Sequence, residues 1–168
     1  IMVVAASNAQ AKSISTEEVK VRTLHNASEM RVQKHINPLT RPGKKQAQLT
    51  RLWGQVVLVA EEVSMMAAAL YNMLDVRSMH GRSKTHDVNE TSYTKPHHHF
   101  GRVPIVIHLG DFLQLTPTAN IGLVEDVNAK NEDGSYKFSD LEKVTVEIQH
   151  GIRLFGRIPH VYELRGTK

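Results

Sequence analysis

The stretch VVLVAEEVSMM, residues 56–66, decides how the rest of the chain is interpreted. Five apolar residues run without alternation and stop at two adjacent carboxylates, Glu61 and Glu62. An unbroken apolar run of this length is typical of a strand buried on both faces in a parallel sheet covered by helices. Ser64 is suited to cap a following helix from Met65 to about residue 80. The stretch predicts a strand, an acidic pair and a helix in an α/β fold.

The acidic pair has two interpretations. Open α/β sheets bind ligands at the carboxyl ends of their strands. In P-loop NTPases one carboxylate at such an end holds magnesium and another group handles the attacking water. Acidic residues also end strands simply because the chain emerges into solvent. The pair alone does not separate these two interpretations, so a second motif has to decide.

The composition limits which classes of protein this chain can belong to. The 168 residues fit one domain, with ordinary hydrophobic (40%) and charged (23%) fractions for a soluble globular protein. No apolar run approaches the roughly 20 residues of a membrane span, so no membrane partner is expected. The first residues lack the basic leader of a signal peptide, and Ile1 at the first position hints at a fragment of a longer protein. The absence of cysteine excludes disulfides and cysteine-ligated zinc and fits an intracellular protein.

The net charge of +4 is unevenly spread along the chain. Residues 1–53 contain nine Lys and Arg against three Glu, giving +6, which leaves −2 for the remainder. A basic first third favours a polyanionic partner such as nucleic acid. A solvated basic surface accounts for the same charge, and the two interpretations stay open.

Shorter patterns predict the elements around the central strand. Further strands are expected over residues 1–6, 103–109, 144–148 and 161–164, with residues 20–22 extended. Helices are expected after Ser7 or Asn8, after Thr23, and over 46–53, which brings Trp53 to the base of the central strand. A C-cap is expected at Gly81. Helical spacing predicts an apolar core stripe of Met66, Leu70, Met73 and Leu74. Loops or insertions are expected over 37–45, 82–99 and 124–143.

The strand over 103–109 provides the second motif, because it runs into GDFLQLTP, residues 110–117. Its polar side chains, Asp111 and Gln114, should reach the same edge of the sheet as the acidic pair. Gly110 permits a close turn there. Beside a magnesium-nucleotide site, an uncharged amide can hydrogen-bond a terminal phosphate or position the attacking water. Polar side chains at the ends of two strands favour a nucleotide site over the alternative that Glu61 and Glu62 are acidic only because the chain emerges into solvent there.

Three consecutive histidines, His97, His98 and His99, invite a metal hypothesis. Consecutive residues of a strand or helix do not all face one site, and no cysteine or spaced histidine pattern accompanies them. A solvated loop is the better interpretation.

The two motifs resemble those of Pif-type and RecD-like superfamily-one DNA helicases. Residues 58–66 (LVAEEVSMM) look like the family's Walker B segment, and 100–117 (FGRVPIVIHLGDFLQLTP) look like its next motif, with GDFLQL the most specific part. Weaker matches are 5–11 (AASNAQA) to APTxxAA and 23–25 (TLH) to T-[IL]-H. Leu154-Phe155 and 163–168 look like the run into a later Arg-Phe motif. The resemblance implies that residues 1–168 are part of one RecA-like ATPase domain.

The resemblance also implies roles for individual residues. Glu61 stands where the family has its magnesium-associated Asp, and Glu62 matches the Glu that activates water. Gln114 matches the γ-phosphate-sensing Gln, and Asp111 is its companion. Ser7, with Asn8 beside it, occupies the place of a Thr that touches single-stranded DNA. His25 matches a His near that path.

Some positions depart from the family pattern. Glu61 is one methylene longer than Asp, which disturbs the strict octahedral shell of magnesium. Ala6 and Thr116 replace prolines. Gly43-Lys44-Lys45 is not a phosphate loop, because GxxxxGK[ST] needs Gly at 38 and Ser or Thr at 45, where this chain has Pro and Lys.

The expected function is ATP-dependent DNA unwinding by a longer parent protein that supplies the P-loop and a second RecA-like domain. The resemblance implies Mg²⁺ and ATP, single-stranded and duplex DNA as partners, roles in DNA repair, recombination and telomere maintenance, and a nuclear or mitochondrial location. The isolated chain is expected to be inactive. The alternative is a non-catalytic nucleic-acid-binding remnant of a helicase.

Overall fold

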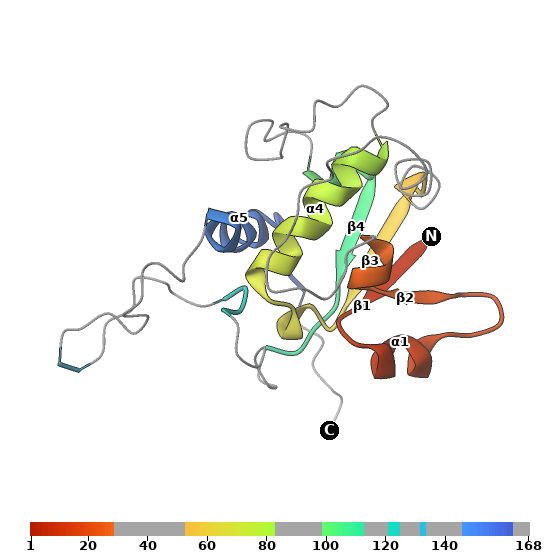
Figure 1. Ribbon diagram of the computed structural model, residues 1–168, viewed down its shortest axis with the longest axis horizontal. Coiled ribbons are helices and arrows are strands. Elements are labelled where there is room, and N and C mark those ends of the chain that lie inside the picture. Colours follow the sequence, from red (N-terminus) through yellow and green to blue (C-terminus); the bar gives the residue numbers. More distant parts are fainter. Residues whose placement is uncertain (29–52, 83–98, 113–120, 125–131, 134–145, 163–168) are drawn as a thin grey trace.

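The computed structural model describes residues 1–28, 53–82, 99–112, 121–124, 132–133 and 146–162 (Figure 1). Its four strands are β1 (Met2–Ala5), β2 (Val21–Thr23), β3 (Val57–Glu61) and β4 (Ile105–His108). They form one sheet in the order β2-β1-β3-β4, and every neighbouring pair is parallel. The predicted α/β class with a parallel sheet is confirmed.

Helices and 3-10 turns connect these strands. They are α1 (Asn8–Ile14), α2 (Leu24–Ala27), η1 (Val63–Met65), α4 (Ala68–Arg82), η2 (His99–Arg102) and α5 (Val146–Phe155). Ser7 caps α1 in a reciprocal capping box with Gln10, and the Thr23 side chain caps α2. Both predicted caps are confirmed.

The core lies between the sheet and α4, which runs beside β4 in Figure 1. Leu58 and Ala60 of β3 are 1% and 0% exposed and belong to one cluster with Tyr71 and Leu74 of α4. Trp53 is fully buried, and its indole N–H donates to the Ala27 carbonyl at 3.2 Å. The predicted core role of Met66, Met73 and Leu74 is confirmed, since all three are buried.

The opposite face of the sheet is partly exposed along β3 and β4, whereas Ala5 of β1 on the same face is buried. The register pairs Val57 with Ile105 and Val59 with Ile107, so these side chains share that face. Ile105 and Ile107 are 49% and 42% exposed, and the two valines are half-buried. The prediction of strands buried on both faces is therefore wrong for these residues.

The helix after the acidic pair begins later than predicted. Glu62 adopts a left-handed conformation with φ 52°, so the chain turns sharply into η1 and Ser64 lies inside that turn, where it caps no α-helix. Ala67 then forms an antiparallel bridge with Gly122, which keeps the chain extended until α4 begins at Ala68.

The end of α4 also differs from the prediction. Gly81 lies within the helix and is no C-cap, because α4 continues to Arg82. The Arg82 guanidinium donates to the carbonyl oxygens of Trp53, Gln55 and Gly101 at 2.7–2.8 Å. These hydrogen bonds anchor the last turn of the helix to the segments before β3 and β4.

The strand predicted over residues 144–148 is wrong, because Val146 opens the α-helix α5. Its buried residues, Gly151 and Leu154, are three apart and face α4. A Cβ added to Gly151 would lie 1.9 Å from the Ala68 carbonyl oxygen, so only glycine allows the two helices to approach this closely. Tertiary packing overrides the short alternating pattern.

Several predictions fall outside the described residues. They concern the helix before Trp53, the loop at 37–45, most of the loops at 82–99 and 124–143, the strand beyond residue 162, and Gln114, His97 and His98. His99 begins η2 and is half-buried, so it does not lie in an open solvated loop.

None of the helices within the described ranges combines the length and the apolar character that a membrane crossing requires.

Candidate functional site

The strand order reverses between β1 and β3. From β1 the chain moves outward to β2 and then returns to the other side of β1 to form β3 and β4. In open α/β sheets, ligands bind outside the carboxyl ends of the strands at such a switch point. Ala5 lies opposite Glu61 in the register, so the exits of β1 and β3 meet there. We name this edge, formed by residues 6–8, 61–64 and 109–112, the carboxyl rim.

Backbone hydrogen bonds lock the exits of β3 and β4 together on this rim. The Leu109 N–H donates to the Ala60 carbonyl, and the Leu109 carbonyl accepts from the Val63 N–H, each at 2.9 Å. A Cβ added to Gly110 would lie 3.0 Å from the Ser64 nitrogen, so the absence of a side chain lets the two segments approach closely. Glu62 and Asp111 therefore leave neighbouring parallel strands at one edge of the sheet.

The two carboxylates of the acidic pair differ in their surroundings. Glu61 ends β3 and is half-buried, with its Cα paired to that of Ala5. Glu62 has the left-handed backbone that non-glycine residues rarely adopt and that concentrates at functional sites. Its Oε2 atom is buried and has no hydrogen-bond partner. A buried carboxylate oxygen without a donor is costly, which is expected where a ligand supplies the missing contact.

Ser64 is a rim residue whose side chain the sequence pattern misread as a helix cap. It is 6% exposed, and its hydroxyl oxygen has no hydrogen-bond partner. Two unsatisfied oxygens, from Glu62 and Ser64, thus occur within three residues of each other. The only sequence signal for this feature is the position of Ser64 directly after the acidic pair.

The oxygen atoms of the rim suit a hard cation. Magnesium is usually held by one or two carboxylates together with substrate phosphates and water. Glu62, with its unpartnered Oε2, and Glu61 beside it fit such partial coordination. Within the ranges that the structure describes, no group of three or more His, Asp or Glu side chains forms a complete metal site. Magnesium on this rim would therefore depend on ligands from phosphate or from elsewhere in the protein.

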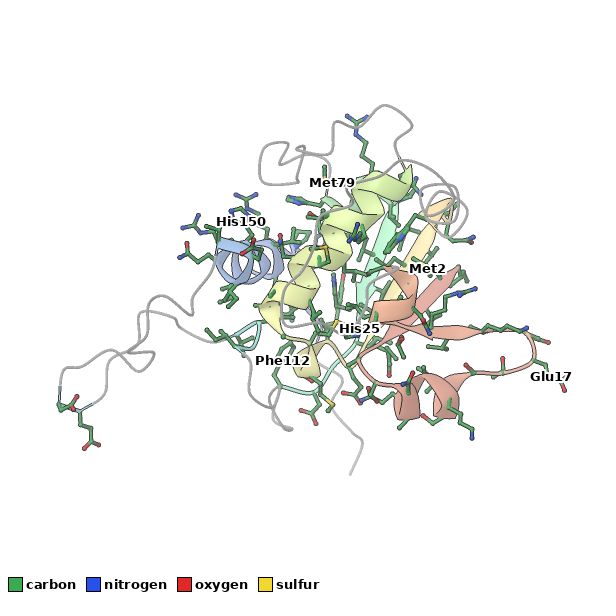
Figure 2. All side chains as sticks on the ribbon, viewed as in Figure 1. Met2, Glu17, His25, Met79, Phe112 and His150 are labelled. Atoms are coloured by element: carbon green, nitrogen blue, oxygen red, sulfur yellow. The ribbon has the colours of Figure 1, made fainter. Side chains whose placement is uncertain are left out.

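The predicted DNA-contacting residues lie after β1 and β2. The Ser7 hydroxyl accepts from the Gln10 N–H at 3.3 Å and lies 3.0 Å from Gln10 Oε1, so it is already engaged in the helix cap. Asn8 is exposed. His25, labelled in Figure 2, is half-buried in α2, and burial lowers the pKa of its ring.

Two further contacts connect the rim to the helices and were not predicted. The Gln10 amide donates to the Met65 sulfur at 3.3 Å, which joins α1 to the turn after the acidic pair. The Tyr71 hydroxyl of α4 lies 2.7 Å from His108 Nε2 at the end of β4. No local sequence pattern links residues so far apart, although a histidine within an apolar strand was a visible irregularity.

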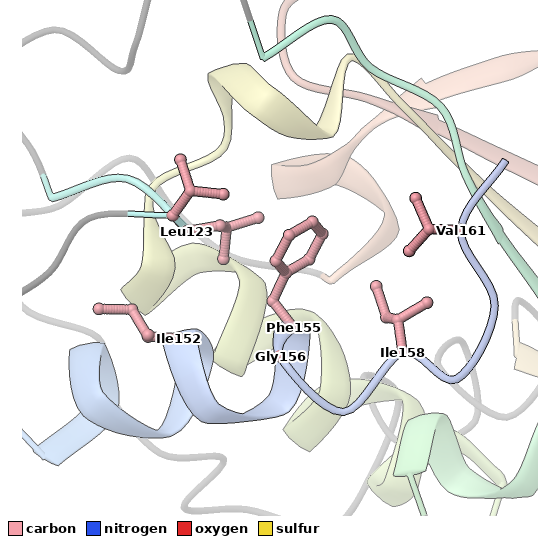
Figure 3. A pocket seen from close by; sticks show the side chains of 7 residues that line it. Leu123, Ile152, Phe155, Gly156, Ile158 and Val161 are labelled. Carbon is pink, nitrogen blue, oxygen red and sulfur yellow. The ribbon is translucent and has the colours of Figure 1, made fainter. Parts of the chain in front are cut away.

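A separate apolar pocket of about 460 Å³ lies beside α5. Figure 3 shows Leu123, Ile152, Phe155, Ile158 and Val161 around it. Its lining contains no charged side chain, so it is not suited to phosphate or magnesium. The carboxyl rim remains the candidate functional site.

No family model and no curated protein matches this chain. Among solved structures, it is similar to unliganded Pif1 from Bacteroides sp. (20% identity, TM-score 0.48) and to Bacteroides sp. Pif1 in complex with ADP-AlF4 (20%, 0.48). It is also similar to Bacteroides Pif1 bound to ssDNA (17%, 0.46). Each similarity covers 71% of this chain and 24% of the other chain. Likeness at this level does not establish a function for this chain.

Proposed function

We propose that this chain is part of the ATPase domain of an ATP-dependent DNA helicase, whose ATP hydrolysis drives DNA unwinding. The observation that supports the proposal is the pairing of β3 with β4. Because these strands are parallel neighbours tied through Leu109, Glu62 and Asp111 leave the sheet at the same rim. In P-loop NTPases an acidic group holds magnesium and an acidic or amide group orients the attacking water.

The proposed roles follow the chemistry of the rim. Glu62 would accept a proton from the attacking water, and its unpartnered Oε2 is available for that contact. Glu61 would stand near magnesium, which when bound neutralises charge on the phosphates. Asp111 and Gln114 would face the terminal phosphate. Gln114 lies outside the described residues, and its role rests on the resemblance of its motif.

A phosphate-binding loop would have to come from outside these residues, since the chain has no GxxxxGK[ST] pattern. Such a loop follows a strand. In the described sheet β4 is an edge strand, and its residues, Ile105–His108, include no Asp, Glu, Lys, Arg or Pro to discourage further pairing. A parallel strand added beside β4 would deliver its loop to the carboxyl rim.

The DNA partner is proposed on the other side of the switch point. Asn8, which is exposed, and His25, which is half-buried, would contact single-stranded DNA, and duplex DNA would be the substrate for unwinding. Roles in DNA repair, recombination and telomere maintenance, and a nuclear or mitochondrial location, are part of the proposal. They rest on the resemblance of the motifs.

The test is ATP turnover by the longer protein that contains this chain. Glu62→Gln keeps the shape of the side chain but removes the base, and we expect turnover to fall about 10²- to 10⁴-fold. Glu18→Gln, at an exposed position, is the matched control and should leave turnover unchanged. Equal turnover in Glu62→Gln and the parent protein would overturn the assignment. The isolated 168-residue chain should show no turnover.

The second candidate is a nucleic-acid-binding remnant without catalysis. It is favoured by Glu61, which stands in the place of an Asp, and by the absence of a phosphate loop from the sequence. The discriminating measurement is binding of single-stranded DNA to the isolated chain, without nucleotide, over a range of salt concentrations. Salt-dependent binding with no turnover in the longer protein supports the remnant, whereas no binding at low salt excludes it.

A further inference from the structure

A buried tyrosine and a histidine join α4 to the carboxyl end of β4. Tyr71 is fully buried, and its hydroxyl lies 2.7 Å from Nε2 of His108, the last residue of the strand. The two rings pack with Phe100 of η2 and Phe155 of α5 at centroid distances of 5.6–6.2 Å. The pair therefore sits where three elements meet the strand.

The direction of this hydrogen bond follows from the surroundings. Burial lowers the pKa of His108 to about 4, so its ring is neutral at pH 7. Burial, with a smaller contribution from the charge of Asp75, raises the pKa of Tyr71, so the hydroxyl keeps its proton. Tyr71 is thus the donor, His108 Nε2 is the acceptor, and the remaining ring proton lies on Nδ1.

The residue after His108 carries the connection to the rim. The Leu109 N–H and carbonyl bond to Ala60 and Val63 on either side of the acidic pair, and Asp111 follows two residues later. A side chain that fixes His108 from the α4 face therefore also fixes the segment that leads to Asp111. The hydrogen bond from Tyr71 is the polar contact that the structure gives the His108 ring.

We propose that Tyr71 and His108 are positioning residues that hold the exit of β4 against the exit of β3, and thereby set the place of Asp111 relative to Glu62. The use of this arrangement in ATP hydrolysis rests on the proposed function. The positioning itself concerns the chain alone and is measurable without nucleotide or DNA.

Few titratable groups face the His108 ring from the elements packed against it. From α4 the group is Tyr71, on which Asp75 acts. From η2 and α5 the contacting side chains are Phe100 and Phe155, which do not titrate. Protonation of His108 would remove the acceptor from Tyr71 and place a charge among aromatic rings, which loosens the exit of β4.

The test is amide hydrogen exchange of the 168-residue chain, read at Leu109 and Val63 and compared with Val4 in the middle of the sheet. Tyr71→Phe removes only the hydroxyl, and loss of about one hydrogen bond should lower protection at Leu109 and Val63 about 5- to 10-fold more than at Val4. Tyr162→Phe, at a position 86% exposed, is the matched control and should change none of them. Equal loss of protection at all three amides would show a merely structural role and overturn the proposal.

The pH profile provides the second readout. In the parent chain, protection at Leu109 should fall relative to Val4 as pH drops from about 6.5 to 4 and His108 gains its proton. His108→Gln supplies an uncharged acceptor and should remove this pH dependence while keeping protection at pH 7, whereas His108→Leu should lose protection at every pH. Protection that is independent of pH in the parent chain would overturn the proposal.

Discussion

The two faces of the sheet show how differently one set of strands can be used. On the face covered by α4, Leu58 and Ala60 are almost completely buried, and the core, the Tyr71–His108 pair and the close contact with α5 all lie on this side. On the opposite face Ile105, Ile107 and Leu109 are 42–49% exposed. Parallel sheets normally bury both faces, so further parts of the protein are expected to pack against the exposed side of β3 and β4. Substitutions on the covered face should therefore change the free energy of unfolding of this chain more than substitutions on the exposed face.

Truncation of Leu58 should show the largest effect. Leu58→Ala removes a side chain that is 1% exposed, leaves a cavity under α4, and should lower the free energy of unfolding by about 2–5 kcal/mol. Urea unfolding followed by circular dichroism measures it. A cost below about 1 kcal/mol would mean that α4 does not cover β3 as tightly as the structure shows.

Acidification should destabilise the covered face through His108. The folded-state pKa of about 4 lies below the ordinary 6.5, so the unfolded chain binds the proton more readily between these values. Stability should therefore fall as pH drops from about 6.5 to 4, by up to roughly 3 kcal/mol, and then level off for this group. The urea midpoint as a function of pH measures the effect. The same slope in His108→Gln would assign it to other groups.

Gly151→Ala should test the contact between α5 and α4. The added methyl meets the Ala68 backbone, and overpacking against backbone costs about 1–3 kcal/mol. Gly156→Ala is the control, because its Cβ would make only ordinary contacts at 3.5 Å or more. Thermal unfolding of the two variants should differ by several degrees, and equal melting temperatures would contradict the close helix approach.

Substitution on the exposed face should have the smallest effect. Ile107→Thr keeps a β-branched side chain at a position that is 42% exposed, and the free energy of unfolding should change by less than about 1 kcal/mol. Urea unfolding beside Leu58→Ala measures the contrast. A cost as large as that of Leu58→Ala would show that this face is covered in solution.

Local patterns predicted part of the structure correctly. The apolar runs that became β1, β3 and β4, and the caps at Ser7 and Thr23, depend on neighbouring residues and are readable in a short window. The predicted strand over 144–148 failed because a five-residue pattern is too short to distinguish a strand from a helix. Gly151 and Leu154, which make that helix dock on α4, lie beyond the window.

The candidate site, too, was only partly predictable from the sequence. Sequence alone indicated that Glu61, Glu62 and Asp111 would end strands, and that Gly110 would allow a close turn. It did not indicate the left-handed backbone of Glu62, the unpartnered Ser64 hydroxyl or the Tyr71–His108 hydrogen bond. These features arise where residues distant in the chain meet. The proposed catalytic and DNA-binding roles stay predictions.

For this protein, sequence by itself determined the approximate positions of β1, β3 and β4, which residues cap the first two helices, and which acidic side chains lie at the end of the central strand. Those features depend on hydrophobic periodicity and on hydrogen bonds within a few residues. Tertiary structure decided that β3 lies between β1 and β4, that residues 146–155 form a helix, and that one face of the sheet is partly exposed. Strand order and helix docking are set by packing between segments far apart in the chain, which no local pattern encodes.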